Sequence, residues 1–445
     1  MSFRPGFKRP LHTALAFLVL FAVGIGVWTC AGAGEKSRNK VLLIGMDAGE
    51  WDVMGPLLDQ QKLPAFATLR AQGASGRLRS LEPLTKSPII WASIATGKVP
   101  EKHGISDFFV KRAEKSREAA KAAGEEGDAP TTSNLWRARP VWDIVGSLGK
   151  RVGVIGWWTT WPAQQVNGWM VSDYVQYDDG SWPAKDARRT YPESLDSLVQ
   201  AMRRTPQSVS WAELFQFVAP IDTTKVTQRQ KDLLQDLRWI YAADMTFYRV
   251  GMHLYKTHKP EFMTVYFRGV DAASHRYWDI DIPGSFNPPL TDAEYQWMRT
   301  LIPNYYVFTD RLIGNFMKEA DSNTNVVVCS DHGFMGGGKG VMAHKLDGIV
   351  FMKGPGVKKG VTIAGATVLD VTPTVLTLFG LPTAQDMDGR PIEDALTSGT
   401  MKKIARDTRL KTYETAARKP GGEAPIASPV DEELRERLRS LGYIQ

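Results

Sequence analysis

Three short apolar runs, each followed by an aspartate, constrain the fold of this chain most strongly. The runs cover residues 41–46, 262–270 and 325–329, and the aspartates that follow them are Asp47, Asp271 and Asp331. Apolar runs of this length are typical of buried strands in a parallel sheet, which is covered on both faces. Parallel strands end at one edge of a sheet, where ligands bind in open α/β folds. The sequence therefore predicts an α/β protein with three carboxylates on one rim.

The last of these strands is followed by a carboxylate and an imidazole in succession, Asp331 and His332. Both side chains are common metal ligands. Carboxylates a few Å apart resist joint ionisation unless cations lie between them. The rim is therefore predicted to bind metal ions. The alternative for Asp331 and His332 alone is that they cap the segment that follows the strand.

The composition is that of a globular protein. The 445 residues are 43% hydrophobic and 23% charged, which suffices for one large α/β core or two smaller ones. The net charge of +7 is spread along the chain, so no nucleic-acid binding is expected. We predict a main domain over residues 38–415, with a partly helical cap inserted at about 174–303. Residues 416–445 are predicted to form a linker and a short amphipathic helix.

The first 34 residues have the pattern of a signal peptide or an N-terminal membrane anchor. Arg4, Lys8 and Arg9 precede an uncharged stretch whose centre, residues 14–27, is nearly all apolar. The rest of the chain is therefore expected to be extracytoplasmic, in the periplasm or at the cell surface. Cleavage of the leader, its retention as a membrane anchor and lipidation of Cys30 stay open.

Ser87 opens a predicted helix that runs to Gly97. Ser87 before Pro88 matches an N-cap followed by proline at the first helical position. The plain interpretation of Ser87 is a structural cap. A hydroxyl at a helix N-terminus also lies where the helix dipole stabilises a phosphate or an alkoxide. Beside metal ions, Ser87 would be a nucleophile.

These motifs, in this order, resemble the alkaline phosphatase superfamily, and within it the type I phosphodiesterase and nucleotide pyrophosphatase branch. The resemblance spans residues 41 to about 391 and rests on Asp47, 87–97, 102–105, Asp271 with His275, 331–333, His344, 370–376 and 387–391. It implies a largely parallel sheet with helices on both faces. It also implies two divalent metal ions, commonly Zn²⁺ with Mn²⁺ as an alternative, about 4 Å apart.

The resemblance also assigns ligands. One ion would be bound by Asp47, Asp331 and His332, with Ser87 completing its shell. The other would be bound by Asp271, His275 and His344. The four-residue separation of Asp271 and His275 independently allows both to reach one ion from a single helix face.

The catalytic residue implied by the resemblance is Ser87, and Thr85 is the alternative if the alignment is two residues out. His103 follows the nucleophile helix and could line the site, although a structural role is the simpler interpretation. No nucleotide cofactor is expected. Residues 333–340 match part of a phosphate-binding loop but lack a Ser or Thr after Lys339.

The implied function is a metal-dependent hydrolase of phosphodiesters, pyrophosphates or phosphomonoesters that acts through a covalent phosphoseryl intermediate. Its substrate would be a small-molecule or lipid-linked phosphoester. One alternative is an envelope phosphotransferase that moves a phosphoethanolamine or phosphoglycerol group to a lipid or glycan. Another is a non-catalytic metal-binding envelope protein. Trp157, Trp158 and Trp161 follow another predicted strand and could either stack on a substrate or pack the rim of the sheet.

Overall fold

The computed structural model describes residues 39–112, 127–177, 182, 187–282, 285–336, 344–404, 410–415, 424–440 and 444. The predicted leader, residues 1–34, and most of the predicted linker, residues 416–423, lie outside this part of the chain. Within the described residues, no helix combines the length and the apolar character needed to cross a bilayer.

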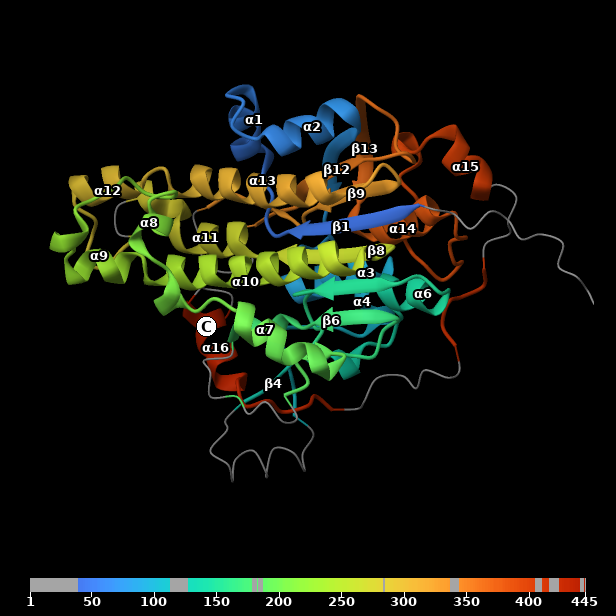
Figure 1. The fold of residues 1–445 in the computed structure, drawn as a ribbon, viewed down its shortest axis with the longest axis horizontal. Coiled ribbons are helices and arrows are strands. Elements are labelled where there is room, and N and C mark those ends of the chain that lie inside the picture. Colours follow the sequence, from blue (N-terminus) through green and yellow to red (C-terminus); the bar gives the residue numbers. More distant parts are fainter. Residues whose placement is uncertain are drawn as a thin grey trace, which may run out of the picture. The chain divides into compact units, whose positions relative to one another are not determined.

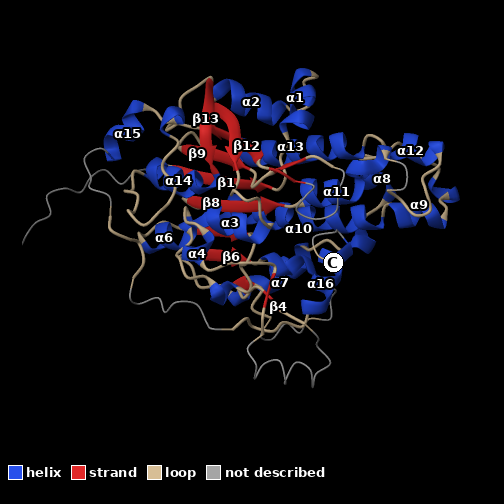
Figure 2. Cartoon of the chain, turned by 180° about the vertical axis from the view of Figure 1, so that it is seen from behind, coloured by secondary structure: helices blue, strands red, loops and turns tan. Residues whose placement is uncertain are grey.

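A mixed sheet of nine strands forms the centre of the fold, in the order β13-β2-β12-β9-β1-β8-β5-β6-β7 (Figure 1, Figure 2). In that order the strands are β13 (Val361–Thr367), β2 (Ala74–Arg79), β12 (Asp347–Lys353), β9 (Thr324–Cys329), β1 (Lys40–Met46), β8 (Phe262–Phe267), β5 (Val152–Ile155), β6 (Gly168–Val171) and β7 (Thr190–Tyr191). Within this sheet, β12 and β7 run antiparallel to their neighbours, and the other pairings are parallel. The predicted largely parallel α/β sheet is confirmed.

The three strands predicted to carry the aspartates are direct neighbours, β9, β1 and β8. Gly45 of β1 pairs with Cys329 of β9, and Met46 pairs with Phe267 of β8. Their apolar side chains are buried. Because the strands are parallel and end at nearly the same level, the residues that follow them emerge side by side.

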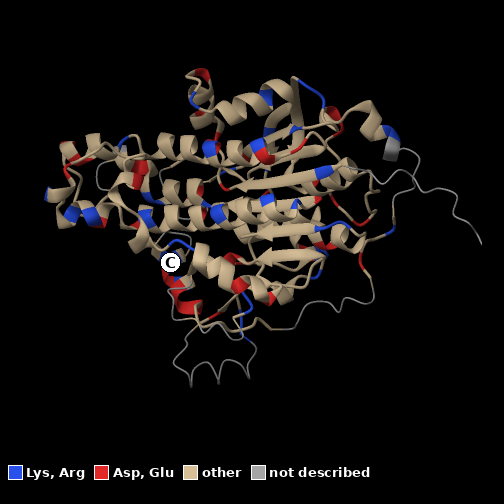
Figure 3. Cartoon of the chain, in the orientation of Figure 1, with Lys and Arg blue, Asp and Glu red and all other residues tan. Residues whose placement is uncertain are grey.

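Helices cover both faces of the sheet, as predicted. On one face lie α2 (Pro64–Gln72), α10 (Gln235–His258) and α13 (Leu301–Glu319); on the other lie α3 (Ser87–Thr96), α6 (Val141–Ser147) and α14 (Val371–Phe379). Successive residues of β8 point to opposite faces of the sheet. Phe267 packs against Phe316 of α13, and Tyr266 packs against Trp91 of α3. Lys, Arg, Asp and Glu are concentrated on the outer helices and loops (Figure 3), and among the strands β8, β5, β6 and β9 contain none of them.

Residues 174–303 do not form one insertion separate from the core. The long helix α10 packs on β5 and β8, so both α10 and β8 belong to the central layers. Three shorter helices, α8 (Trp211–Leu214), α9 (Gln228–Leu233) and α12 (Asp292–Met298), are grouped beyond the carboxyl ends of the strands (Figure 1). A cap built from these helices stays a prediction.

The C-terminal segment contributes a helix, α16 (Asp431–Ser440), with Leu434 and Leu438 buried. Arg435 Nη2 donates to the carbonyl oxygen of Asp128 over 2.5 Å, and the Arg435 guanidinium lies 4.5 Å from the ring centre of Phe109. The helix is therefore attached to the body of the protein by both apolar and polar contacts.

Candidate metal centre

The predicted ligands emerge from the carboxyl edge of the three central strands. Asp47 follows β1, and Asp331 and His332 follow β9. Asp271 and His275 lie on α11 (Gly269–Tyr277), which begins two residues after the end of β8. The short strands β10 (Gly333–Phe334) and β11 (His344–Lys345) are paired, with Phe334 opposite His344. This pairing returns His344 to the end of β9.

One cluster of donor atoms surrounds His332 Nε2. This nitrogen lies 3.5 Å from Asp47 Oδ1, 3.2 Å from Asp331 Oδ2 and 3.5 Å from Ser87 Oγ. His332 Nδ1 lies 3.1 Å from the carbonyl oxygen of Gly333. Because a carbonyl can only accept, Nδ1 carries the proton and Nε2 presents a lone pair to the cluster.

A second cluster lies directly beside the first. His275 Nε2 and His344 Nε2 are 2.8 Å apart, and they lie 3.5 and 3.4 Å from Asp271 Oδ1. The rings of His332 and His344 are stacked with their centres 3.8 Å apart. One donor atom each of Asp271, His332 and His344 lie within 4.8 Å of one another, as do those of Asp47, Asp331 and His332. The structure thus brings together all the residues predicted as ligands.

The buried carboxylates of the first cluster fit a bound cation. Asp47 Oδ1 and Asp331 Oδ2 are buried, and the described residues place no hydrogen-bond donor on either oxygen. Burial and the nearby Asp271 carboxylate raise the pKa of Asp47 to about 7, and burial and Asp47 raise the pKa of Asp331 well above its ordinary value. A divalent cation would reverse this penalty, because it stabilises the ionised carboxylates. Aspartate oxygens and neutral imidazole nitrogens are a donor set that Zn²⁺ and related ions accept.

Ser87 differs in one respect from its prediction as an N-cap. The N-cap of α3 is Lys86, so Ser87 is the first helical residue, and Gly97 ends the helix in the left-handed region at φ 68°. The side chain of Lys86 makes no capping hydrogen bond. The Ser87 hydroxyl lies 3.5 Å from His332 Nε2. Thr85, the alternative nucleophile, lies in the preceding loop and is half-buried.

Two aromatic donors beside Asp47 were not predicted from the sequence. Trp91 Nε1 donates to Asp47 Oδ2 over 3.3 Å, and the Tyr266 hydroxyl donates to the same oxygen. In the sequence both residues look like ordinary core positions of a helix and a strand. Nothing in their local pattern indicates a partner 44 or 219 residues away.

The tryptophans that follow β5 pack the interior of the protein. Trp157, Trp158 and Trp161 are all buried. Trp157 Nε1 donates to the carbonyl oxygen of Trp91 over 3.2 Å, and Trp161 Nε1 donates to that of Ala187 over 3.0 Å. These contacts agree with the packing interpretation of the three tryptophans.

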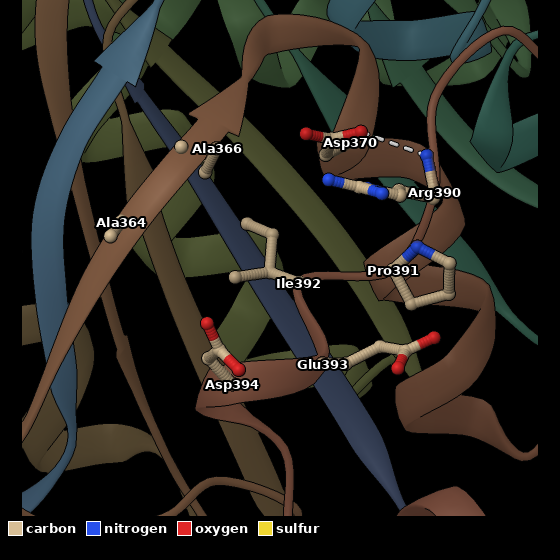
Figure 4. Close-up of a pocket in the computed structure, with 9 residues that line it drawn as sticks. Ala364, Ala366, Asp370, Arg390, Pro391, Ile392, Glu393 and Asp394 are labelled. Carbon is tan, nitrogen blue, oxygen red and sulfur yellow. Dashed lines mark hydrogen bonds between the residues drawn. The ribbon is translucent and has the colours of Figure 1, made fainter.

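The C-terminal motifs at 370–376 and 387–391 support the helix that carries Ser87. The backbone N–H groups of Asp388 and Gly389 donate to the carbonyl oxygen of Gly97, and Thr372 Oγ1 donates to that of Ile94. In Figure 4, Asp370 accepts the backbone N–H of Arg390 beside a pocket of about 270 Å³. None of the predicted ligands lines this pocket, so these motifs act as structural support.

Comparisons with known proteins agree with this site. A family model described as type I phosphodiesterase/nucleotide pyrophosphatase matches residues 41–374. A search of curated proteins gives no match.

Solved structures show distant likenesses. Human ectonucleotide pyrophosphatase/phosphodiesterase 5 is 12% identical with a TM-score of 0.46, and the alignment covers 81% of this chain and 100% of that chain. A phosphonate monoester hydrolase from Silicibacter pomeroyi is 16% identical with a TM-score of 0.43, over 80% of this chain and 76% of that chain. Phosphonoacetate hydrolase from Sinorhizobium meliloti is 18% identical with a TM-score of 0.39, over 67% of this chain and 57% of that chain.

The family match covers most of the described domain, including the three central strands and both donor clusters. The chain belongs to the type I phosphodiesterase/nucleotide pyrophosphatase family of the alkaline phosphatase superfamily, and it is a phosphoric ester hydrolase.

Proposed function

We propose that this hydrolase cleaves phosphoesters at a centre of two divalent cations, with Ser87 as the nucleophile. The observation that carries the proposal is the position of Ser87 Oγ, 3.5 Å from His332 Nε2, where the two donor clusters adjoin. A serine with only a structural role would not need to lie beside His332, the imidazole that both groups of donor atoms share.

Each donor cluster would hold one ion. Asp47, Asp331 and His332 would bind the first, with Ser87 Oγ as a further ligand. The second would be bound by a carboxylate and two imidazoles, from Asp271, His275 and His344. Zn²⁺ is the first choice for these ligands, and Mn²⁺ is the alternative. When bound, the cations would polarise the phosphoryl oxygens and lower the pKa of the serine hydroxyl and of a bound water.

The residues of the chain position the reaction. Ser87 is the first residue of α3, so the positive end of the helix dipole faces an attacking oxygen and the phosphate beside it. Ser87 gives up its hydroxyl proton to solvent and its Oγ bonds to phosphorus, while the bond from phosphorus to the leaving oxygen breaks. Water then attacks phosphorus, the bond to Oγ breaks, and Ser87 regains a proton. The intermediate would be a phosphoseryl or phosphodiester-seryl enzyme.

The test compares Ser87→Ala with Thr85→Ala. Ser87→Ala is expected to lower kcat on the order of 10³-fold or more, as removal of a nucleophile does, while the metal content and the melting temperature stay close to those of the wild type. Thr85→Ala is expected to keep most of the activity. Acid quenching during turnover, followed by peptide mass spectrometry, is expected to find the phosphoryl group on the peptide that contains Ser87. Near wild-type turnover by Ser87→Ala would remove this residue from the role.

The substrate is to be identified by a screen of phosphodiesters, nucleotide pyrophosphates and phosphomonoesters, with an added acceptor alcohol in a parallel reaction. Release of the product into water supports the hydrolase. Transfer to the alcohol in preference to water would support a phosphotransferase.

We also propose an extracytoplasmic location, because Arg4, Lys8 and Arg9 precede the apolar stretch of the leader. Fractionation of cells that express the full chain tests this proposal. Recovery of the protein in the cytoplasm would contradict it.

A further inference from the structure

Two consecutive hydrogen bonds, here called the hydrogen-bond chain, end at the Asp47 carboxylate. Trp158 Nε1 donates to the Tyr266 hydroxyl over 2.7 Å, and that hydroxyl donates to Asp47 Oδ2. An indole N–H can only donate, so the tyrosine oxygen accepts from Trp158. The tyrosine proton is thereby left to point at the carboxylate.

The two oxygens of Asp47 have different surroundings, because the hydrogen-bond chain ends on only one of them. Oδ2 receives Tyr266 and, over 3.3 Å, the indole N–H of Trp91. Oδ1 lies 3.5 Å from His332 Nε2, inside the donor cluster, and the described residues offer it no hydrogen-bond donor. Rotation of the Asp47 carboxylate would break both bonds to Oδ2.

The positively charged side chain of Arg268 lies over the ring of Trp158, which is the first donor of the hydrogen-bond chain. The guanidinium of Arg268 lies 4.5 Å from the ring centre of Trp158, and both side chains are buried. A cation over the face of an indole draws electron density from the ring, which makes its N–H group a stronger donor. Arg268 therefore strengthens the hydrogen bond from Trp158 to Tyr266 and, through it, the bond from Tyr266 to Asp47.

We propose that Tyr266 is a positioning residue which, with Trp158 behind it, holds Asp47 so that Oδ1 faces a cation and thereby raises the affinity of the site for that ion. The inference rests on the proposed function, because it requires an ion at Asp47, Asp331 and His332. Hydrogen-bond partners of metal ligands typically change metal affinity 10- to 100-fold.

The experiment compares Tyr266→Phe with Tyr277→Phe. Tyr277 is an equally buried tyrosine on α11, but its hydroxyl donates to the carbonyl oxygen of Leu233 over 2.9 Å and accepts the N–H of Leu237 over 3.2 Å. Both variants lose one buried hydroxyl, so both are expected to melt at a lower temperature. Zn²⁺ is titrated into chelator-stripped full-length protein in competition with a chromophoric chelator. We expect Tyr266→Phe to weaken one of the two binding steps about 10- to 100-fold and Tyr277→Phe to leave both unchanged.

The outcomes separate the two proposals. A wild-type protein that binds neither Zn²⁺ nor Mn²⁺ would overturn the proposed function itself. A wild-type protein that binds Zn²⁺, with a Tyr266→Phe variant that binds it equally well, would overturn the inference alone. The visible spectrum of the Co²⁺-loaded protein gives an independent readout, since a reoriented Asp47 changes the ligand field and a loss of stability elsewhere does not.

Trp158→Phe tests the same series of hydrogen bonds from its first donor, and it serves by itself if Tyr266→Phe does not fold. Alone it is expected to weaken the same binding step, by a smaller factor. In the Tyr266→Phe background it is expected to add little, because it acts through the missing hydroxyl. Fully additive effects of the two substitutions on Zn²⁺ affinity would contradict the chain.

Discussion

Two groups of buried carboxylates in this protein have opposite surroundings. Asp173 accepts the backbone N–H groups of Thr159, Thr160 and Trp161 at 3.0 to 3.2 Å, and the Thr160 hydroxyl as well. Asp331 accepts the N–H of Ala48 at 3.4 Å on Oδ1, and no donor of the described residues reaches its Oδ2. A carboxylate surrounded by backbone donors holds a turn in place. A carboxylate with an open oxygen beside imidazoles is available to a ligand.

The buried histidines show the same contrast. His103 Nδ1 accepts the N–H of Ile105 at 3.2 Å, so its Nε2 carries the proton and donates to Ser93 Oγ over 2.9 Å. Both nitrogens are satisfied, which agrees with a structural histidine. His332 Nδ1 contacts the backbone carbonyl of Gly333, whereas its Nε2 faces the Asp331 carboxylate. The partners of each ring nitrogen, and not burial alone, separate the two roles.

The largest effect expected from this contrast is on catalysis. Asp331→Asn removes an anionic ligand and is expected to lower kcat/KM on the order of 10³-fold, because several kcal/mol of metal-dependent stabilisation are lost. The same substitution relieves repulsion between buried carboxylates, so the metal-free variant should melt no lower than the metal-free wild type. A variant that keeps its bound metal and most of its activity would contradict the assignment.

The next effect concerns acid stability. Burial lowers the pKa of His103 from 6.5 to about 3, so between these pH values the unfolded chain binds a proton that the folded protein does not. Stability is therefore lost as the pH falls from about 6.5 toward about 3. In His103→Gln this part of the loss, a few kcal/mol, is expected to be absent. Urea unfolding at a series of pH values tests this, and equal slopes in the two proteins would show that His103 is not the group responsible.

Asp173→Asn is expected to cost about 2 kcal/mol of stability, because an amide N–H₂ group replaces one acceptor that faces backbone donors. The activity per folded molecule is expected to stay within about twofold, since Asp173 does not belong to either donor cluster. This variant is the matched control for Asp331→Asn. If it abolished the activity of the folded protein, the division between structural and ligand-binding carboxylates would be wrong.

The smallest effect on stability is expected for substitution of Asp310. This carboxylate accepts the N–H groups of Ala65 and Phe66 at 3.1 and 2.9 Å, at the start of α2. Asp310→Ala removes these two bonds and is expected to destabilise the protein by about 1 kcal/mol, with no change in metal binding. Thermal unfolding with and without Zn²⁺ measures both quantities. A change in Zn²⁺ stoichiometry would mean that the two regions are coupled.

Three apolar runs with the same ending allowed the central strands β1, β8 and β9 to be predicted, and the rest of the largely parallel sheet was expected from the family resemblance. The sequence also placed Asp47, Asp331 and His332 on one rim, since they directly follow their strands. Other features depend on contacts between distant segments. The hydrogen bond from Tyr266 to Asp47 joins a residue of β8 to the residue that follows the neighbouring strand β1, and no local pattern sets it. The N-cap of α3 was predicted one residue late, at Ser87, because Ser before Pro is a strong cap signal that the tertiary structure overrides.

We expect two cations to bind between the carboxylates and imidazoles at the ends of β1, β8 and β9. Anomalous diffraction from crystals of the Zn²⁺-loaded protein tests it most directly. We expect two peaks about 4 Å apart, one in contact with Asp47, Asp331 and His332 and the other with Asp271, His275 and His344. The absence of any peak at these residues in catalytically active protein would contradict it.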